Sequence, residues 1–112
     1  MRIAIPVTRD RLCPHFGHAE AFAFIDVDEK EGNIDSTKFL NAPDHQPGLL
    51  PAWLKEEGAN LVIAGGMGMR ARNIFTQHGI EVVVGAADGS SEEIVKAYLA
   101  GKLETGDNIC DH

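Results

Sequence analysis

The chain has 112 residues, of which 44% are hydrophobic and 24% charged, and its formal net charge is −7. This length fits one domain with a real core, and the composition is that of an ordinary globular protein. The acidic balance argues against a nucleic-acid partner, because binding phosphates requires a basic face. No apolar run approaches the roughly 20 residues that span a bilayer, and the first residues lack the pattern of a signal peptide. We therefore expect a cytoplasmic protein without a membrane partner.

The first forty residues predict three strands. Hydrophobic residues alternate with smaller or polar ones in three segments, over 2–8, 21–29 and 34–40. The intervening residues 9–19 contain proline and glycine and are interpreted as a loop, whereas 31–33 have the composition of a hairpin turn. Three successive strands with short connections predict an antiparallel meander.

From Leu49 onward the pattern changes to an alternation of helices and strands. Helices are predicted from Leu49 to Gly58, over 69–78 and over 90–102, with buried strands over 60–66 and 80–86. This alternation predicts parallel strands with right-handed crossovers. The expected class is α/β, with the order β-β-β-α-β-α-β-α and a mixed five-stranded sheet.

One domain is expected over residues 1–102. No periodicity remains in residues 103–112, which end in Cys-Asp-His. These last residues are predicted to be a flexible C-terminal tail.

The segment AGGMGMRAR, residues 64–72, follows a predicted buried strand and opens a predicted helix. Unpaired N–H groups and the helix dipole favour an anion at such a position, while glycines allow close approach of the backbone. The candidate anion- or cofactor-binding residues are Gly65, Gly66, Gly68, Arg70 and Arg72. A tight turn without a ligand and an anion-binding turn both remain open. A dinucleotide site is less favoured, because the G-x-G-x-x-A match lacks a preceding βαβ half.

Cysteine and histidine side chains gather in RLCPHFGHAE, residues 11–20, and recur near the C-terminus. These side chains are the usual ligands of zinc, copper(I) and iron. The candidate metal ligands are Cys13, His15, His18, His45, Cys110 and His112. Their spacing is not that of a structural zinc finger, so a shared metal site and solvated loop residues both remain open. His78, near the end of a predicted helix, is interpreted as structural.

Catalytic residues are not expected. Asp26 and Asp28 point to the same face of a predicted strand and are interpreted as its solvated face. A thiolate–imidazole pair of Cys13 with His15 or His18 would need special loop geometry, because the residues are so close in sequence.

Two longer segments carry a family likeness. PHFGHAEAFAFIDVD (14–28) and HQPGLLPAWLKEEGANLVIAGGMGMRARNIFTQHGIEVVVGA (45–86) resemble the dinitrogenase iron–molybdenum cofactor biosynthesis family. This family includes small stand-alone domains of anaerobic bacteria and archaea and parts of NifX- and NifB-type proteins. The resemblance runs from the first strand through the last helix. It implies a ribonuclease H-like fold with strand order 3-2-1-4-5. The acidic residues of ribonuclease H are replaced here by IAIPV and AGG, so nuclease chemistry is not implied.

The resemblance further implies a non-enzymatic carrier of an iron–sulfur or molybdenum/iron–sulfur cluster, or its precursor, in metal-cofactor assembly or storage. The resemblance implies that His15 is a metal ligand of the family type, whereas Cys13 and His18 match the family less closely. A single transition metal is a further candidate. The implied partners are the cluster and cofactor-assembly proteins, with the chain acting as a monomer or homodimer. The alternatives are a nucleotide- or anion-binding regulatory module that uses residues 65–72, and a scaffold without a ligand.

Overall fold

The computed structural model describes residues 1–13, 19–42, 49–86, 89–101 and 103. These residues form six strands and three helices. In chain order the elements are β1 (Arg2–Thr8), β2 (Arg11–Leu12), β3 (Ala21–Asp28), β4 (Asn33–Asn41), α1 (Leu49–Glu56), β5 (Leu61–Ile63), α2 (Met69–Gln77), β6 (Glu81–Val83) and α3 (Ser91–Leu99).

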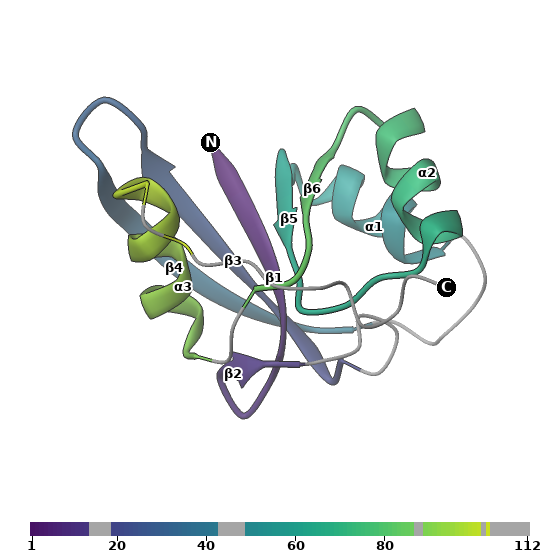
Figure 1. Cartoon of the computed structure of the whole chain (residues 1–112), viewed down its shortest axis with the longest axis horizontal. Helices are drawn as coiled ribbons and strands as arrows, with labels where there is room; N and C mark the ends of the chain where they lie inside the picture. Colours follow the sequence, from purple (N-terminus) through teal and green to yellow (C-terminus); the bar gives the residue numbers. More distant parts are fainter. Residues whose placement is uncertain (14–18, 43–48, 87–88, 102, 104–112) are drawn as a thin grey trace.

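One mixed sheet forms the centre of the molecule, with the strand order β4-β3-β1-β5-β6 (Figure 1). β3 is antiparallel to both β1 and β4, whereas β5 is parallel to both β1 and β6. The expected α/β class with a mixed sheet is therefore confirmed. Counted along the chain, the five predicted strands lie in the order third, second, first, fourth, fifth.

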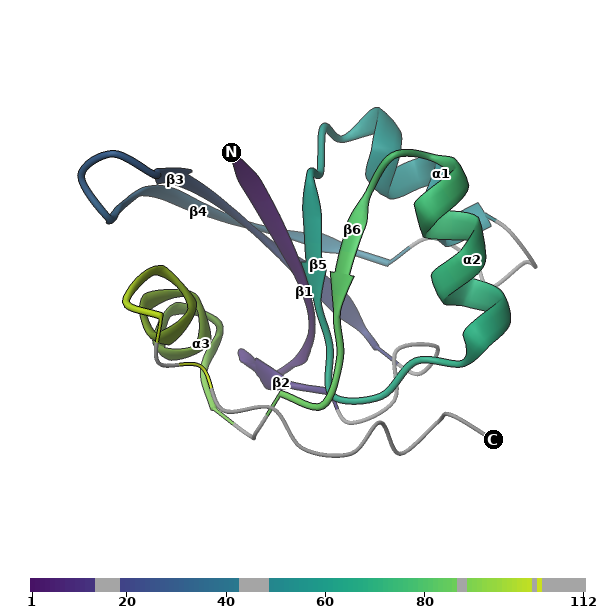
Figure 2. The same ribbon diagram turned by 45° about the horizontal axis from the view of Figure 1, so that its top comes forward.

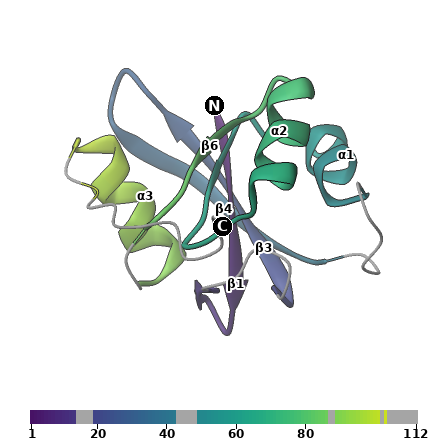
Figure 3. The same ribbon diagram turned by 45° about the vertical axis from the view of Figure 1, so that its right-hand side comes forward.

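The three helices cover the two faces of the sheet. α1 and α2 pack on one face and α3 on the other, as Figures 1 and 3 both show. On the first face, Phe22 and Phe24 of β3 meet Trp53 of α1 edge to face, each at 5.6 Å between ring centroids. On the second face, Ile94 and Val95 of α3 are buried against the sheet. Each face thus has its own hydrophobic core.

Residues 9–12 correct one sequence prediction, because part of the expected loop 9–19 is a strand. Arg9 and Asp10 have φ angles of 54° and 59°. Two successive residues with positive φ make a tight turn that matches strand twist, and aspartate tolerates this conformation better than most residues. The turn lets β2 pair back on β1, with Leu12 opposite Val7. β2 is therefore an additional strand beside the five that the sequence predicts.

β6 corrects a second prediction, because it is not buried on both faces. Glu81 is exposed, Val82 and Val83 are half-buried, and the strand lies at one end of the sheet with β5 as its neighbour. β5, in contrast, is buried throughout, as expected. Both strands are shorter than predicted.

The helix ends follow the predicted signals. Gly58 and Gly79, just beyond α1 and α2, have φ angles of 86° and 76°. Ser90 and Glu93 form the expected capping box at the start of α3. α3 ends at Leu99, however, three residues before the predicted end.

Leu103 packs against the core on the α3 face. Residue 102 and residues 104–112 lie outside the described part of the chain, so the domain boundary and the flexible tail stay predictions. Among the described residues, no helix is long and apolar enough to cross a membrane.

Candidate functional site

The carboxyl ends of the parallel strands β1, β5 and β6 lie at one edge of the sheet, which we call the carboxyl edge. Figure 1 shows the N-terminus and β2 at opposite ends of β1, and in Figure 2 β2 lies at the same end as the connection from β5 to α2. Ligands of open α/β sheets usually bind outside the carboxyl ends of the strands. The candidate site is therefore sought at this edge.

The glycine-rich connection between β5 and α2 is held to the end of β6 by backbone hydrogen bonds. The Ala64 N–H donates to the Val83 carbonyl at 2.8 Å, and the Gly85 N–H donates to the Gly65 carbonyl at 2.9 Å. Gly65 and Gly66 are buried, and Met67 is almost completely buried. The backbone of this turn is thus fixed by its neighbours.

The N-terminus of α2 lies at the end of the same turn. Gly68 is the N-cap residue, no side chain caps the helix, and the first turn contains no acidic residue. Arg70 is exposed and Arg72 half-buried near this helix start. Because the helix dipole also places partial positive charge here, this end of α2 favours an anion. All five predicted anion-binding residues thus lie in the glycine-rich turn or in the first turn of α2.

Cys13 lies at the carboxyl edge beside the point where β5 ends. One side of β1 pairs with β3, and its other side pairs first with β5, with Ala4 opposite Val62, and then with β2. The Cys13 N–H donates to the Pro6 carbonyl at 2.9 Å, only two residues beyond Ala4. Cys13 is 6% exposed. The structure thus places this predicted ligand next to the glycine-rich turn.

The other five predicted ligands, His15, His18, His45, Cys110 and His112, lie outside the described residues. Among the described residues, no group of three or more histidine, cysteine or acidic side chains could hold a metal ion. The ligand set as a whole therefore stays a prediction.

Glu20, Ala21 and Ala42 lie at the carboxyl edge. The Ala42 N–H donates to the Glu20 carbonyl at 3.0 Å, and the adjacent Ala21 pairs with Val7 near the end of β1. Segments 14–18 and 43–48, which contain three of the histidines, themselves lie outside the described residues.

His78 has the structural role that was expected. It is the C-cap residue of α2, and its Nδ1 lies 2.9 Å from the Ile74 carbonyl oxygen. In the tautomer with its proton on Nδ1, the ring donates to that carbonyl, which also accepts from the His78 backbone N–H at 3.1 Å. His78 therefore contributes to the end of α2, and it is not one of the predicted ligands.

At the opposite edge of the sheet, which we call the amino edge, Asp26 is bound rather than simply solvated. Arg2 Nε donates to Asp26 Oδ1 at 2.7 Å, and Arg2 Nη2 donates to Oδ2 at 3.2 Å. Arg2 lowers the pKa of Asp26 below its ordinary value, mainly by this hydrogen bonding, although partial burial opposes the shift. Arg2 also donates from Nη1 to the Glu57 carbonyl. No local sequence pattern reveals this pair, because its partners are 24 positions apart.

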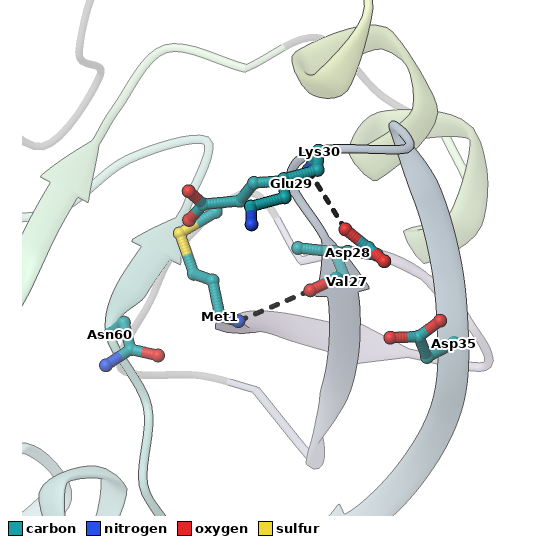
Figure 4. A pocket seen from close by; sticks show the side chains of 7 residues that line it. All are labelled: Met1, Val27, Asp28, Glu29, Lys30, Asp35 and Asn60. Carbon is teal, nitrogen blue, oxygen red and sulfur yellow. Dashed lines mark hydrogen bonds between the residues drawn. The ribbon is translucent and has the colours of Figure 1, made fainter.

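The amino edge also carries an open pocket of about 670 Å³ (Figure 4). Its lining residues are Met1, Val27, Asp28, Glu29, Lys30, Asp35 and Asn60. The Met1 ammonium donates to the Val27 carbonyl at 3.3 Å, and Asp28 Oδ1 accepts from the Lys30 N–H at 2.9 Å. Asp28 therefore caps the β3–β4 turn, and none of the predicted site residues lines this pocket.

Asp10 and Ser91 are two further residues near the candidate site that the sequence analysis missed. The Ser91 hydroxyl donates to Asp10 Oδ1 at 2.7 Å, across 81 positions of sequence. An aspartate at a turn is a recognisable signal, but nothing in the sequence links it to a particular serine on a distant helix.

The fold and the candidate site define a small α/β domain with a glycine-rich turn and a buried cysteine at the carboxyl edge of its sheet. A model of the family described as dinitrogenase iron-molybdenum cofactor matches residues 1–101. The chain therefore belongs to this family, which confirms the family expected from its motifs.

Similar proteins cover nearly the whole chain. Uncharacterized protein MJ0580 from Methanocaldococcus jannaschii is 34% identical over 93% of this chain and 90% of its own. The crystal structure of PH0822 has a TM-score of 0.86 and 33% identity, over 94% of each chain. The apo form of the orange protein (ORP) from Desulfovibrio gigas has a TM-score of 0.71 and 22% identity, over 96% of this chain and 93% of its own. At that identity the orange protein supports the fold alone.

Proposed function

We propose that this protein binds and carries an iron–sulfur or molybdenum-containing sulfide cluster, or its precursor, in cytoplasmic metal-cofactor assembly or storage. The cluster is cargo, and the protein does not catalyse a reaction on it. The observation that carries the proposal is the position of Cys13 at the carboxyl edge, beside the glycine-rich turn that opens α2. Membership of the dinitrogenase iron–molybdenum cofactor family supports it. We also assign the sheet, with its order β4-β3-β1-β5-β6, to the ribonuclease H-like class.

The donor chemistry of the proposed site fits such a cargo. Thiolates and imidazoles are ligands for iron, copper(I) and metal–sulfur clusters. The proposed ligand set is Cys13 with His15, His18, His45, Cys110 and His112. One chain supplies two thiolates, fewer than the four of a conventional cluster, so histidines or a second copy must complete the coordination.

The start of α2 is proposed to hold the negative charge of the cargo. Metal–sulfide clusters are anionic, and the uncapped helix N-terminus is favourable for an anion. The backbone of Gly65, Gly66 and Gly68 would approach the cargo, with Arg70 and Arg72 adding positive charge.

Anaerobic reconstitution tests this site. Apo protein is mixed with iron and sulfide, or with tetrathiomolybdate and copper(I), and the charge-transfer absorption of the desalted protein is recorded. We expect Cys13→Ser and His15→Ala to lose most of this absorption, because each substitution removes a donor atom that thiolate or imidazole coordination of the cargo requires. His78→Gln is the matched control and should retain it. Unchanged uptake in both ligand variants would contradict the site assignment.

A second candidate function is a nucleotide- or anion-binding regulatory module at residues 65–72. The absence of a side-chain cap and of acidic residues at the start of α2 favours it. Stabilisation of metal-free protein by ATP or NADH in a thermal-shift assay, lost in Arg70→Gln, would support this alternative. The cluster-carrier proposal predicts no such stabilisation.

A further inference from the structure

We propose that Asp10 and Ser91 are positioning residues that hold Cys13 in place at the carboxyl edge. The inference rests on the proposed function only for what the thiol binds. The position of Cys13 itself follows from contacts among the described residues.

The first contact is the side-chain hydrogen bond between the β1–β2 turn and the start of α3. The Ser91 hydroxyl donates to Asp10 Oδ1 at 2.7 Å, and Ser91 is 0% exposed. Asp10 itself is exposed and has a φ of 59°. The bond therefore joins a buried serine, fixed in the first turn of a helix, to a strained turn at the surface.

The second set of contacts joins backbone to backbone on both sides of β2. Leu12 lies opposite Val7 of β1, and its N–H donates to the Gly89 carbonyl at 2.9 Å. Arg11 forms a bridge with Ser90 on the same side as Gly89. β2 is therefore held between β1 and the residues that lead into α3.

These contacts matter because β2 is only two residues long and has little stability of its own. Cys13 directly follows it, and the Cys13 N–H continues the same ladder to the Pro6 carbonyl. If the turn at Asp10 loosens, the register of β2 loosens, and the burial of Cys13 is lost with it. The Ser91 hydroxyl, on a different element, thus controls how firmly a proposed ligand is presented.

Thiol reactivity of metal-free protein tests the inference without any cluster. In a Cys110→Ser background Cys13 is the sole thiol of the chain, and its reaction with 5,5′-dithiobis(2-nitrobenzoate) releases one thionitrobenzoate. We expect the buried thiol of this background to react slowly. Ser91→Ala and Asp10→Ala should each raise the rate about tenfold, because a hydrogen bond to a charged group is lost. Asp10→Asn should restore the slow rate, because its carbonyl oxygen accepts the same bond and asparagine tolerates positive φ.

Thr37→Val is the matched control, because Thr37 donates to Glu92 Oε1 of α3 at 3.5 Å without contacting β2. It should leave the rate unchanged. An unchanged rate in Ser91→Ala, or an equal rise in Thr37→Val, would overturn the inference. The inference would also be overturned if the increase in thiol reaction rate were fully accounted for by the lower free energy of global unfolding, measured in urea. Failure of wild-type protein, which keeps Cys110, to take up any metal, with the thiol rates as expected, would overturn the proposed function and leave the positioning role standing.

Discussion

The two edges of the sheet are built differently. At the amino edge, charged side chains bind one another: Arg2 bridges Asp26 and the Glu57 carbonyl, and Asp26 also accepts from Ser36. At the carboxyl edge, backbone hydrogen bonds hold the glycine-rich turn and Cys13, while the start of α2 has no side-chain cap. The difference separates an edge whose polar side chains stabilise the fold from one whose helix start lacks a side-chain cap and is proposed to bind the cargo.

Breaking the amino edge should change stability without changing uptake of a cluster. We expect Arg2→Met to lower the free energy of unfolding by about 1–2 kcal/mol, because it removes a half-exposed ion pair and a hydrogen bond to a backbone carbonyl. Urea denaturation measures the loss. Lys30→Met removes an exposed cation from the same edge and should change stability by less than about 0.5 kcal/mol. Loss of reconstitution in Arg2→Met would show that the two edges are not independent.

Weakening the positive charge at the carboxyl edge should reduce binding of an anionic cargo with little change in stability. We expect the double variant Arg70→Gln/Arg72→Gln to bind tetrathiomolybdate about three- to tenfold more weakly, with little change in stability, because charges near a helix N-terminus contribute modestly to anion binding. Titration by absorption at low and high salt measures the affinity, and the difference from wild type should shrink as salt increases.

Lys55→Gln/Lys96→Gln has the same change in net charge away from this edge and serves as the control. Equal weakening by both double variants would show that net charge, rather than the start of α2, attracts the anion.

The smallest expected effect is the pH dependence of the stability that the Arg2–Asp26 pair contributes at the amino edge. Arg2 lowers the pKa of Asp26 in the folded protein, so the pair contributes stability above the unfolded-state value of about 3.9. That contribution is lost as the pH falls through the folded-state pKa. The stability difference between wild type and Arg2→Met should therefore shrink below about pH 4. Because both side chains are partly exposed, we expect a change below about 1 kcal/mol. Urea titrations between pH 3 and 6 measure it, and a difference that grows on acidification would contradict the assignment.

The sequence predicted those parts of the fold that depend on local signals. Alternating residues located β1, β3 and β4, and the Ser90–Glu93 capping box located the start of α3. The glycine-rich turn was recognised as a helix start because its signal lies within a few residues.

Features that depend on distant partners could not be predicted. β2 is too short to show periodicity, and it forms because two residues of positive φ let the chain fold back on β1. The pairs Arg2–Asp26 and Asp10–Ser91 join residues that only the sheet brings together. For the same reason, the sequence placed Cys13 in a loop without showing that it would be buried beside the glycine-rich turn.

The most direct test of the central claim is elemental analysis, with a visible spectrum, of protein isolated without oxygen. The proposal predicts a reproducible ratio of metal and acid-labile sulfide to protein, together with charge-transfer bands that Cys13→Ser protein lacks. Wild-type protein that carries no metal, takes up none on reconstitution and has the same spectrum as Cys13→Ser would contradict it.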